Sequence, residues 1–385
     1  MNSWNKLRGI AARLKDLTTI GFANSMAALI MALFWFSLAP LLGTESYGEV
    51  SYFIAIASVA YIVSMLGAGN TIVVYTSKEK KTQSSVFFVS IIGSIITSLV
   101  VFFVFYNIGV SLFVIGNVIF ALAVSDLLGR KLYPKFSKYT LIQKIFLVGF
   151  SIPLYYVMGP QGVILGFALS FFPFIPRVAR GLKESKIDTS IIKRRFPFMM
   201  NAYGLDLSRS FTMSADKLII APLFGFALLG NYHLGFQFLM LLSILPSTVY
   251  AYILPHDASG HQNRKLKKAT ILASVALAII GISIAPLVLP FLLPDFKEAV
   301  EIIQIMSFGI IPISINLMYT SKFLGIEKSK IVLIGAIIYV AIQILGIFLL
   351  GQIYGINGAA IALVLAAASQ SAYLITADKF ILKTR

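Results

Sequence analysis

The sequence predicts an all-α polytopic membrane protein, with twelve transmembrane helices in two six-helix lobes around a central cavity. Of the 385 residues, 58% are hydrophobic and 12% are charged, whereas a soluble domain carries about 25% charged residues. Apolar runs of roughly 20 residues, each able to cross about 30 Å of hydrocarbon, recur along the chain. The segments between these runs alternate between basic and non-basic, which indicates loops on alternating sides of a membrane.

Twelve apolar segments are long enough to be transmembrane spans. Those longer than about 23 residues can tilt or emerge into water. In chain order, we expect the spans at residues 18–42, 47–76, 84–106, 110–128, 139–158, 162–178, 196–222, 230–254, 269–292, 299–321, 331–350 and 355–377.

The basic residues predict the orientation of the spans. Of the 32 Lys and Arg residues, 28 lie in segments on the side of the N-terminus, and Lys297 is the only one in a segment on the opposite side. Basic loops stay in the cytoplasm, so both termini are predicted to be cytoplasmic and the number of spans to be even. The chain is predicted to lie in the plasma or inner membrane of the cell and to cross it many times.

The composition also limits the partners and the chemistry. The net charge of +17 is spread over short loops, as the positive-inside rule requires, so anionic membrane lipids are the expected partner and nucleic acid is excluded. The absence of cysteine excludes disulfides and thiolate chemistry. The sequence has no G-x-x-x-x-G-K-[ST] motif, and its three histidines lack metal-ligand spacing. No metal or cofactor is therefore expected.

Charge and span order together predict five segments. Residues 1–16 are expected to form a cytoplasmic amphipathic arm, because basic and apolar residues alternate there at helical spacing. The first six spans make an N-lobe at 17–180, and the last six make a C-lobe at 196–378. A basic cytoplasmic linker at 181–195 joins the lobes, and a cytoplasmic tail follows at 379–385.

An internal repeat supports the division into two lobes. PLLG followed by a glycine, within 40–48, matches PLFG followed by a glycine at the same spacing, within 222–230. A weaker match pairs GPQG at 159–162 with YGING at 354–358. Six spans per lobe is an even number, so we expect parallel repeats about an axis along the membrane normal, with the substrate path between them.

Six of the charged residues inside the predicted spans are not explained by the topology. A charge at the bilayer centre costs about 3 kcal/mol or more, so such side chains usually face a partner or a water-filled cavity. They are Asp126, Lys144, Asp206, Arg209, Asp216 and Lys217.

The seventh span carries four of these charges on one face. At about 100° per residue, Asp206, Arg209, Asp216 and Lys217 share an arc of roughly 100°. This face predicts one wall of a hydrophilic cavity, with Arg209 near mid-depth contacting an anionic group. The alternative is that Asp206 pairs with Arg209 at i,i+3 as a neutral structural pair. Asp216 and Lys217 lie nearer the outer face, where we expect a structural or gating role.

Four other residues in the spans are candidates. Lys144 in the fifth span either contacts the substrate or snorkels to the cytoplasmic surface. Asn24 and Ser25 in the first span either line the same cavity or mediate helix packing. Asp126 precedes Arg130 by four residues, which favours a surface ion pair over a coupling or gating site.

Three short motifs lie at the ends of predicted spans. LLGTESYGEV at 41–50 follows the first span, DKLIIAPLFG and then LGNY occupy 216–232, and LGIEKSK at 324–330 follows the tenth span. At these spacings they resemble the motifs of the polysaccharide, or lipid-linked oligosaccharide, flippases of the O-antigen flippase kind. That family is part of the multidrug/oligosaccharidyl-lipid/polysaccharide exporter superfamily, so the resemblance implies a MATE-like fold.

The resemblance implies a lipid flippase and not an enzyme. Such a protein moves a polyprenyl-(pyro)phosphate-linked oligosaccharide from the cytoplasmic to the outer leaflet by alternating access, for surface polysaccharide or glycan assembly. Arg209, Asp206, Lys144, Asn24 and Ser25 are then the candidates for the substrate cavity. A glycan polymerase and glycosyltransferases are the further partners that this role implies.

The candidates for coupling or gating are the carboxylates and the lysine that remain. The coupling ion, H⁺ or Na⁺, is left open. These candidates are Asp216, Lys217 and Asp126.

Two alternatives remain open at this point. An ion-coupled MATE-type multidrug or metabolite antiporter would share the fold and would need unpaired carboxylates, for which Asp206 and Asp216 are available. A membrane polysaccharide polymerase or glycosyltransferase would need a sizeable outer loop with catalytic Arg, His or Asp. The predicted outer loops are only a few residues long, which disfavours the enzyme.

Overall fold

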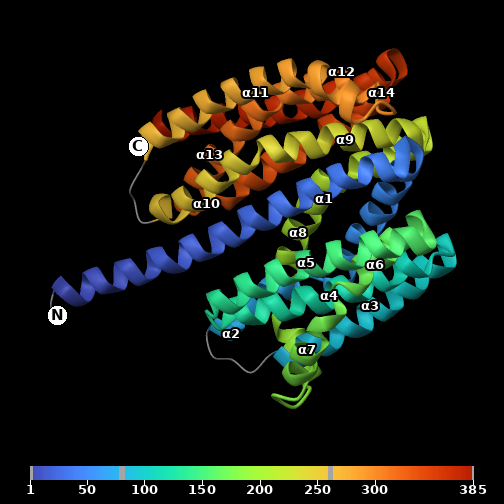
Figure 1. Cartoon of the computed structure of the whole chain (residues 1–385). Helices are drawn as coiled ribbons and strands as arrows, with labels where there is room; N and C mark the ends of the chain where they lie inside the picture. Colours follow the sequence, from blue (N-terminus) through green and yellow to red (C-terminus); the bar gives the residue numbers. More distant parts are fainter. Residues whose placement is uncertain (1–2, 78–82, 259–262, 384–385) are drawn as a thin grey trace. The chain divides into compact units, whose positions relative to one another are not determined.

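The computed structural model describes residues 3–77, 83–258 and 263–383, with the backbone alone described at 3–18, 381–383 and residues 189, 191, 194, 205, 209, 255 and 258. Within these ranges every regular element is a helix and no strand occurs, as the sequence predicts. The helices follow one another along the chain as Figure 1 shows. They are α1 (Ser3–Met65), α2 (Ala68–Ser77), α3 (Gln83–Phe105), α4 (Ile108–Gly129), α5 (Tyr133–Met158), α6 (Pro160–Leu169), the 3₁₀ helix η1 (Phe172–Phe174), α7 (Ile175–Leu182), α8 (Thr189–Phe224), α9 (Phe226–Leu242), α10 (Ile244–Ala258), α11 (Arg264–Leu292), α12 (Ala299–Phe308), α13 (Ile310–Gly325) and α14 (Ser329–Lys383).

Many of these helices are long and apolar enough to cross a membrane. The described residues contain 8 such helices or helix runs, and up to 9 if α9 and α10, bent by 46° at their junction, count as one span. Two of the runs, Thr19–Met65 and Ser329–Phe380, have 47 and 52 residues. Each is two helices joined at a non-helical glycine. A multi-pass membrane protein is therefore confirmed, and the number twelve stays a prediction.

The glycines of the internal repeat have matching backbone conformations. Gly43 has φ 67° and ψ 175°, and Gly225 has φ 84° and ψ 171°. Gly159 has φ 63° and ψ −145°, and Gly355 has φ 58° and ψ −138°. Positive φ is accessible to glycine without steric cost, so each glycine ends one helix and starts the next. The sequence repeat thus corresponds to a repeat of the backbone.

The second pair of repeated segments also has matching close packing. A Cβ added at Gly162 would lie 2.0 Å from the carbonyl oxygen of Leu154, and one at Gly358 would lie 2.1 Å from that of Leu350. These distances are far below a van der Waals contact, so the helix that follows the turn folds back directly on the one before it. A glycine is required at both positions.

Several predicted spans are interrupted in the structure. Leu66 and Gly67 have positive φ values of 45° and 74°, so α1 ends there and the predicted span 47–76 is not one straight helix. Gly67 is needed because a Cβ would lie 2.2 Å from the carbonyl oxygen of Met199 in α8. In the second half, Gly309 separates α12 from α13. These breaks place polar backbone and side chains within the membrane-spanning part of the chain.

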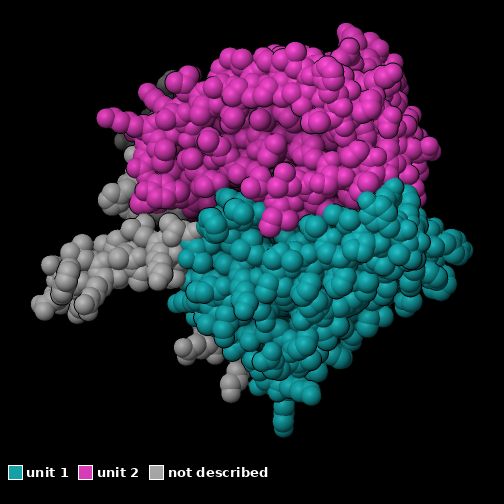
Figure 2. Space-filling view, viewed as in Figure 1, with its two compact units in different colours: residues 1–27, 53–214 teal, residues 28–52, 215–385 magenta. Residues whose placement is uncertain are grey.

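The chain packs into two compact units, which Figure 2 colours separately. Unit 1 comprises residues 1–27 and 53–214, and unit 2 comprises residues 28–52 and 215–385. The units therefore divide within α1 and α8, whereas the predicted lobes divide at the linker. The lobe boundaries stay a prediction.

Each unit has its own apolar core. In unit 1, Ile72, Phe87 and Leu122 from α2, α3 and α4 are 1% exposed or less. In unit 2, Tyr232 of α9 and Met306 of α12 are fully buried among aliphatic residues of α8, α11 and α14.

Candidate functional site

The predicted site residues fall into two groups, one in each unit. Asn24 and Ser25 of α1, Asp126 of α4, Lys144 of α5, and Asp206 and Arg209 of α8 belong to unit 1, whereas Asp216 and Lys217 of α8 belong to unit 2. The four charged residues that share one face of the predicted seventh span are thus divided between the two units, two in each.

Asp206 is held by a side chain of α2 in unit 1. Asn70 Nδ2 donates to both carboxylate oxygens of Asp206, at 3.1 and 3.2 Å. The break at Gly67 brings α8 close to the start of α2, because the glycine lies against the Met199 carbonyl. Sequence reasoning missed Asn70, although an amide within an apolar run was the signal that could have found it.

Arg209 lies in the same helix, one turn beyond Asp206, but its side chain is outside the described part of the structure. The predicted pairing of Asp206 with Arg209 therefore stays a prediction, as does the contact of Arg209 with an anionic group. The backbone at this position is helical and continuous with the rest of α8.

Lys144 is a part-buried cation on α5. Among the described residues, no carboxylate lies within ion-pair distance of its ammonium group. An ammonium at this depth without a counter-charge is costly, by about 3 kcal/mol on insertion scales. The residue therefore has an unmet preference for an anion.

In the predicted topology, Asn24 and Ser25 lie at a depth close to that of Lys144. The Ser137 hydroxyl at the start of α5 donates to the Thr19 carbonyl of α1 at 3.2 Å. Both helices start on the basic side in the predicted topology, and Lys144 follows Ser137 by seven residues, or about 10 Å of helix. The same distance along α1, counted from Thr19, includes Asn24, whose side chain is exposed, and Ser25, whose side chain is part-buried. In the predicted topology these three candidates therefore lie at a similar depth.

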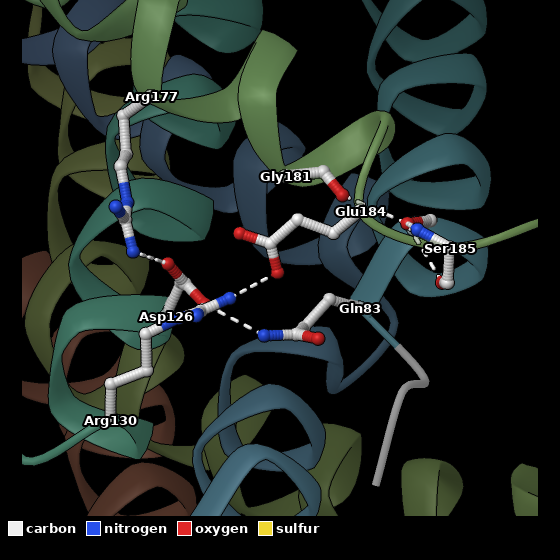
Figure 3. A network of polar contacts seen from close by, with 8 residues as sticks. Gln83, Asp126, Arg130, Arg177, Gly181, Glu184 and Ser185 are labelled. Carbon is white, nitrogen blue, oxygen red and sulfur yellow. Dashed lines mark hydrogen bonds and ion pairs between the residues drawn. The ribbon is translucent and has the colours of Figure 1, made fainter. Parts of the chain in front are cut away.

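Asp126 is the centre of a buried polar network at the end of α4 (Figure 3). Gln83 Nε2 donates to Asp126 Oδ1 at 3.0 Å, Arg130 Nε donates to the same oxygen at 2.8 Å, and Arg177 pairs with Oδ2. The predicted i,i+4 pair with Arg130 is confirmed, but its predicted surface location is wrong because Asp126 is only 2% exposed. Arg177, 51 residues away, covers the carboxylate.

The network also attaches the segment after α7 to α3 and to the end of α4, within unit 1. Arg130 pairs with Glu184, and Ser84 donates to the Gly181 carbonyl at 2.8 Å. Burial alone would lower the pKa of Arg130, but its hydrogen bonds and attraction to Asp126 and Glu184 raise that pKa above its ordinary value. The backbone N–H of Ser185 donates to Ser84 Oγ at 3.0 Å. The first part of the predicted linker is therefore docked on α3 and α4.

Asp216 and Lys217 form a buried pair in unit 2. Lys217 Nζ lies 3.1 Å from Asp216 Oδ1, and the Tyr232 hydroxyl donates to Oδ2 at 2.9 Å. The same ammonium lies 3.9 Å from the centre of the Phe236 ring. Asp216 and Lys217 are 1% and 5% exposed. Both carboxylate oxygens have donors, so the pair is a neutral, desolvated unit that removal of one partner would disrupt.

Tyr232 and its neighbours were not predicted as site residues. The adjacent His233 ring packs edge-on against Trp35 at 4.5 Å between ring centres, and its Nε2 lies 3.1 Å from Gln237 Nε2. His233 therefore has aromatic and amide neighbours, directly after the tyrosine that donates to Asp216. Among the described residues, no group of three or more His, Cys, Asp or Glu side chains is arranged to hold a metal ion.

The helical arrangement matches solved structures of membrane transporters over nearly the whole chain. The lipid II flippase MurJ in an inward closed conformation matches with a TM-score of 0.75 and 16% identity, over 94% of this chain and 87% of that one. An inward-facing multidrug resistance MATE transporter of the MOP superfamily matches with a TM-score of 0.73 and 14% identity, over 94% and 95%. A MOP superfamily transporter from Pyrococcus furiosus matches with a TM-score of 0.55 and 12% identity, over 95% of both chains.

These similarities define the class: an all-helical, multi-pass membrane protein with a MATE-like transporter fold, as the sequence predicts. No curated protein matches the chain by sequence. A family profile described as polysaccharide biosynthesis protein matches residues 37–270, which is more than half of the chain. The chain belongs to this polysaccharide biosynthesis protein family, and the resemblance drawn from the three sequence motifs is confirmed.

Proposed function

We propose that the chain is a lipid flippase that carries a polyprenyl-(pyro)phosphate-linked oligosaccharide from the cytoplasmic to the outer leaflet, for surface polysaccharide or glycan assembly. Membership of a polysaccharide biosynthesis family supports this role. The fold is similar to that of MurJ, a flippase of lipid II, and we extend a lipid-linked substrate from that protein to this one. The lipid tail can stay in the bilayer, while the sugar and phosphate need a polar, cation-bearing path.

The observation that carries the proposal is the lysine on α5. Lys144 is part-buried within a predicted span and has no carboxylate within ion-pair distance among the described residues. A phosphate would supply the missing counter-charge. Asn24 and Ser25 on α1 add groups that can donate to and accept from sugar hydroxyls. Arg209 is proposed as the second phosphate contact, and Asp206 with Asn70 as the polar wall beside it.

The alternating-access mechanism needs two lobes and a path between them. We propose the lobes at 17–180 and 196–378, the linker at 181–195, and twelve spans with both termini in the cytoplasm of the plasma or inner membrane. The repeated glycine conformations support two equivalent halves. Anionic lipids would neutralise the basic loops. A glycan polymerase and glycosyltransferases would use or supply the flipped substrate.

The carboxylates give less support to an ion-coupled antiporter. Asp126 accepts from Gln83 and pairs with two arginines, and both oxygens of Asp216 have donors. A coupling carboxylate must instead exchange its proton or sodium ion during the cycle. We therefore propose that these two residues hold the structure together, and that coupling to H⁺ or Na⁺, where it occurs, uses other groups.

The test is the Lys144→Ala variant in cells that depend on this protein for surface polysaccharide. Loss of a charge-assisted contact to phosphate should weaken head-group binding about tenfold or more, so surface polysaccharide should fall while the protein still inserts into the membrane. Lys144→Arg should keep most of the activity. Lys138→Ala is the matched control, because Lys138 is an exposed lysine on the same helix. Full display in Lys144→Ala cells would remove Lys144 from the substrate path.

A further inference from the structure

An open hollow of about 580 Å³ lies in unit 2, where two turns of the chain meet. One turn joins the two halves of α1 at the Gly43 kink, and the other follows α11. The hollow is lined by Leu42, Gly43, Thr44, Glu45, Ser46, Pro294, Asp295 and Lys297.

Two buried aromatic rings hold the turns together. The Tyr47 ring packs edge-on against the Phe296 ring, with 5.5 Å between their centres. Tyr47 is 0% exposed and Phe296 is 1% exposed. Tyr47 directly follows one lining segment, and Phe296 lies between Asp295 and Lys297 in the other. This ring contact joins the two segments that line the hollow, so the hollow belongs to the fold of unit 2.

The hollow lies at the opposite end of α11 from a basic cluster. Helix α11 has 29 residues and starts at Arg264, within the basic segment 264–268. Its length is about 43 Å, enough to cross the bilayer, and it ends just before Pro294 and Asp295. In the proposed orientation the hollow therefore opens on the outer face.

The lining suits a hydroxylated ligand. Thr44 and Ser46 supply hydroxyls that both donate and accept, Glu45 and Asp295 supply carboxylates, and Lys297 supplies an ammonium group. Neighbouring sugar hydroxyls can donate together to one carboxylate. The volume falls in the usual range for small-ligand sites, about 300–1,000 Å³. Two carboxylates and one ammonium give a net negative lining, which repels phosphate.

We propose that this hollow is an exit site that binds the sugar part of the head group on the outer side of the membrane. The inference rests on the proposed flippase function. At Lys144, a cation without a carboxylate partner among the described residues attracts the phosphate, whereas at the hollow the net negative lining holds neutral or amino sugars and repels the phosphate. The charge difference between the two sites would favour release of the lipid phosphate after translocation.

The chain has no cysteine, so a single introduced thiol can report on the hollow. Ser46→Cys, a nearly isosteric change in the lining, is purified in nanodiscs and labelled with a membrane-impermeant maleimide. The rate of labelling is measured with increasing glucosamine, N-acetylglucosamine or glucose 6-phosphate. We expect the first two sugars to protect the thiol, with glucosamine the better, and glucose 6-phosphate to protect least. Protection by none of them, or best protection by the phosphorylated sugar, would overturn the proposal.

Variants of the carboxylates test the same site independently. In the Ser46→Cys background, Glu45→Gln with Asp295→Asn should weaken glucosamine protection about tenfold, because two charged acceptors are lost. The matched control is Glu298→Gln, an exposed acid in the same turn that does not line the hollow. If glucosamine protects the thiol equally well in the Glu45→Gln/Asp295→Asn variant and in the Glu298→Gln variant, the proposal is overturned. If Lys144→Ala cells display polysaccharide normally while sugars still protect the introduced thiol, the proposed phosphate contact at Lys144 fails and the sugar site stands.

Discussion

Gly48 and Gly230 pack reciprocally against each other's segments. A Cβ on Gly48 would lie 1.9 Å from the carbonyl oxygen of Phe226, and a Cβ on Gly230 would lie 2.0 Å from that of Thr44. Each oxygen belongs to the residue that follows the kinked glycine of its own repeat. The two matching segments of the sequence repeat thus meet at matching positions within unit 2, with no room for a side chain at either glycine.

Gly48→Ala or Gly230→Ala should therefore destabilise the protein. Backbone atoms cannot move aside as a flexible side chain can, so the added methyl group is expected to cost about 1–3 kcal/mol. The measurement is the thermal unfolding midpoint of the purified protein in detergent. Gly149→Ala is the control, because its Cβ would meet nothing within 4 Å in helix α5. An unchanged midpoint for both tight glycines would contradict the close packing.

Asp126→Ala should release the segment after α7 from α3 and α4. The substitution leaves the guanidinium groups of Arg130 and Arg177 without their shared carboxylate, at an expected cost of about 3–5 kcal/mol. Trypsin should then cleave faster after Lys183 and Lys186, which are exposed in this segment. Glu184→Gln is the milder comparison.

Glu184 is more than a third exposed, so loss of its charge should cost at most about 1 kcal/mol. Equal cleavage rates in the Asp126→Ala variant and the unmodified protein would show that the network does not hold the linker.

Lys217→Met should destabilise unit 2 strongly, because the buried Asp216 carboxylate loses its lysine partner. The expected cost is about 3–5 kcal/mol. The double variant Asp216→Asn/Lys217→Met removes both charges and should recover most of this loss. Unfolding midpoints of the two single variants and the double variant form a cycle, with an expected coupling above about 1 kcal/mol. Simple additivity would mean that the two charges do not stabilise each other.

Arg209→Ala is expected to block surface polysaccharide display without changing membrane insertion, because a cation near mid-depth is lost from the proposed path. Surface polysaccharide is measured on whole cells, and insertion by immunoblot of the membrane fraction. The double variant Asp206→Asn/Arg209→Gln separates the two roles of the arginine. If Arg209 binds phosphate, the double variant stays inactive. Restored display would assign Arg209 to a structural pair with Asp206.

The helical class, the family and the repeated glycines could all be predicted from local patterns. A span is apolar because it meets lipid along its own length, so its signal does not depend on which helix packs beside it. A glycine such as Gly43 or Gly225 is needed for a positive φ, which is also a local requirement. For these features the pattern of residues in a short window was sufficient.

The partners of the charged residues could not be predicted in the same way. Asp126 has Arg130 four residues away, which helical spacing indicates, but Gln83 and Arg177 lie 43 and 51 residues from it. Asn70 and Asp206 are 136 residues apart. Charge alone does not mark neutral partners such as Gln83 and Asn70, because local spacing does not show which distant amide will lie beside a carboxylate.

Hydropathy and charge therefore established that the chain crosses a membrane many times and how its basic segments alternate, while three short motifs carried the family resemblance. These properties are set by each segment's contact with lipid or water. Packing between distant helices determined that Asp126 is buried under Arg177, that Asp216 is satisfied by Lys217 and Tyr232, and that Lys144 lacks a carboxylate partner among the described residues. Such contacts depend on which helices become neighbours, and that follows from the close fit of the whole chain.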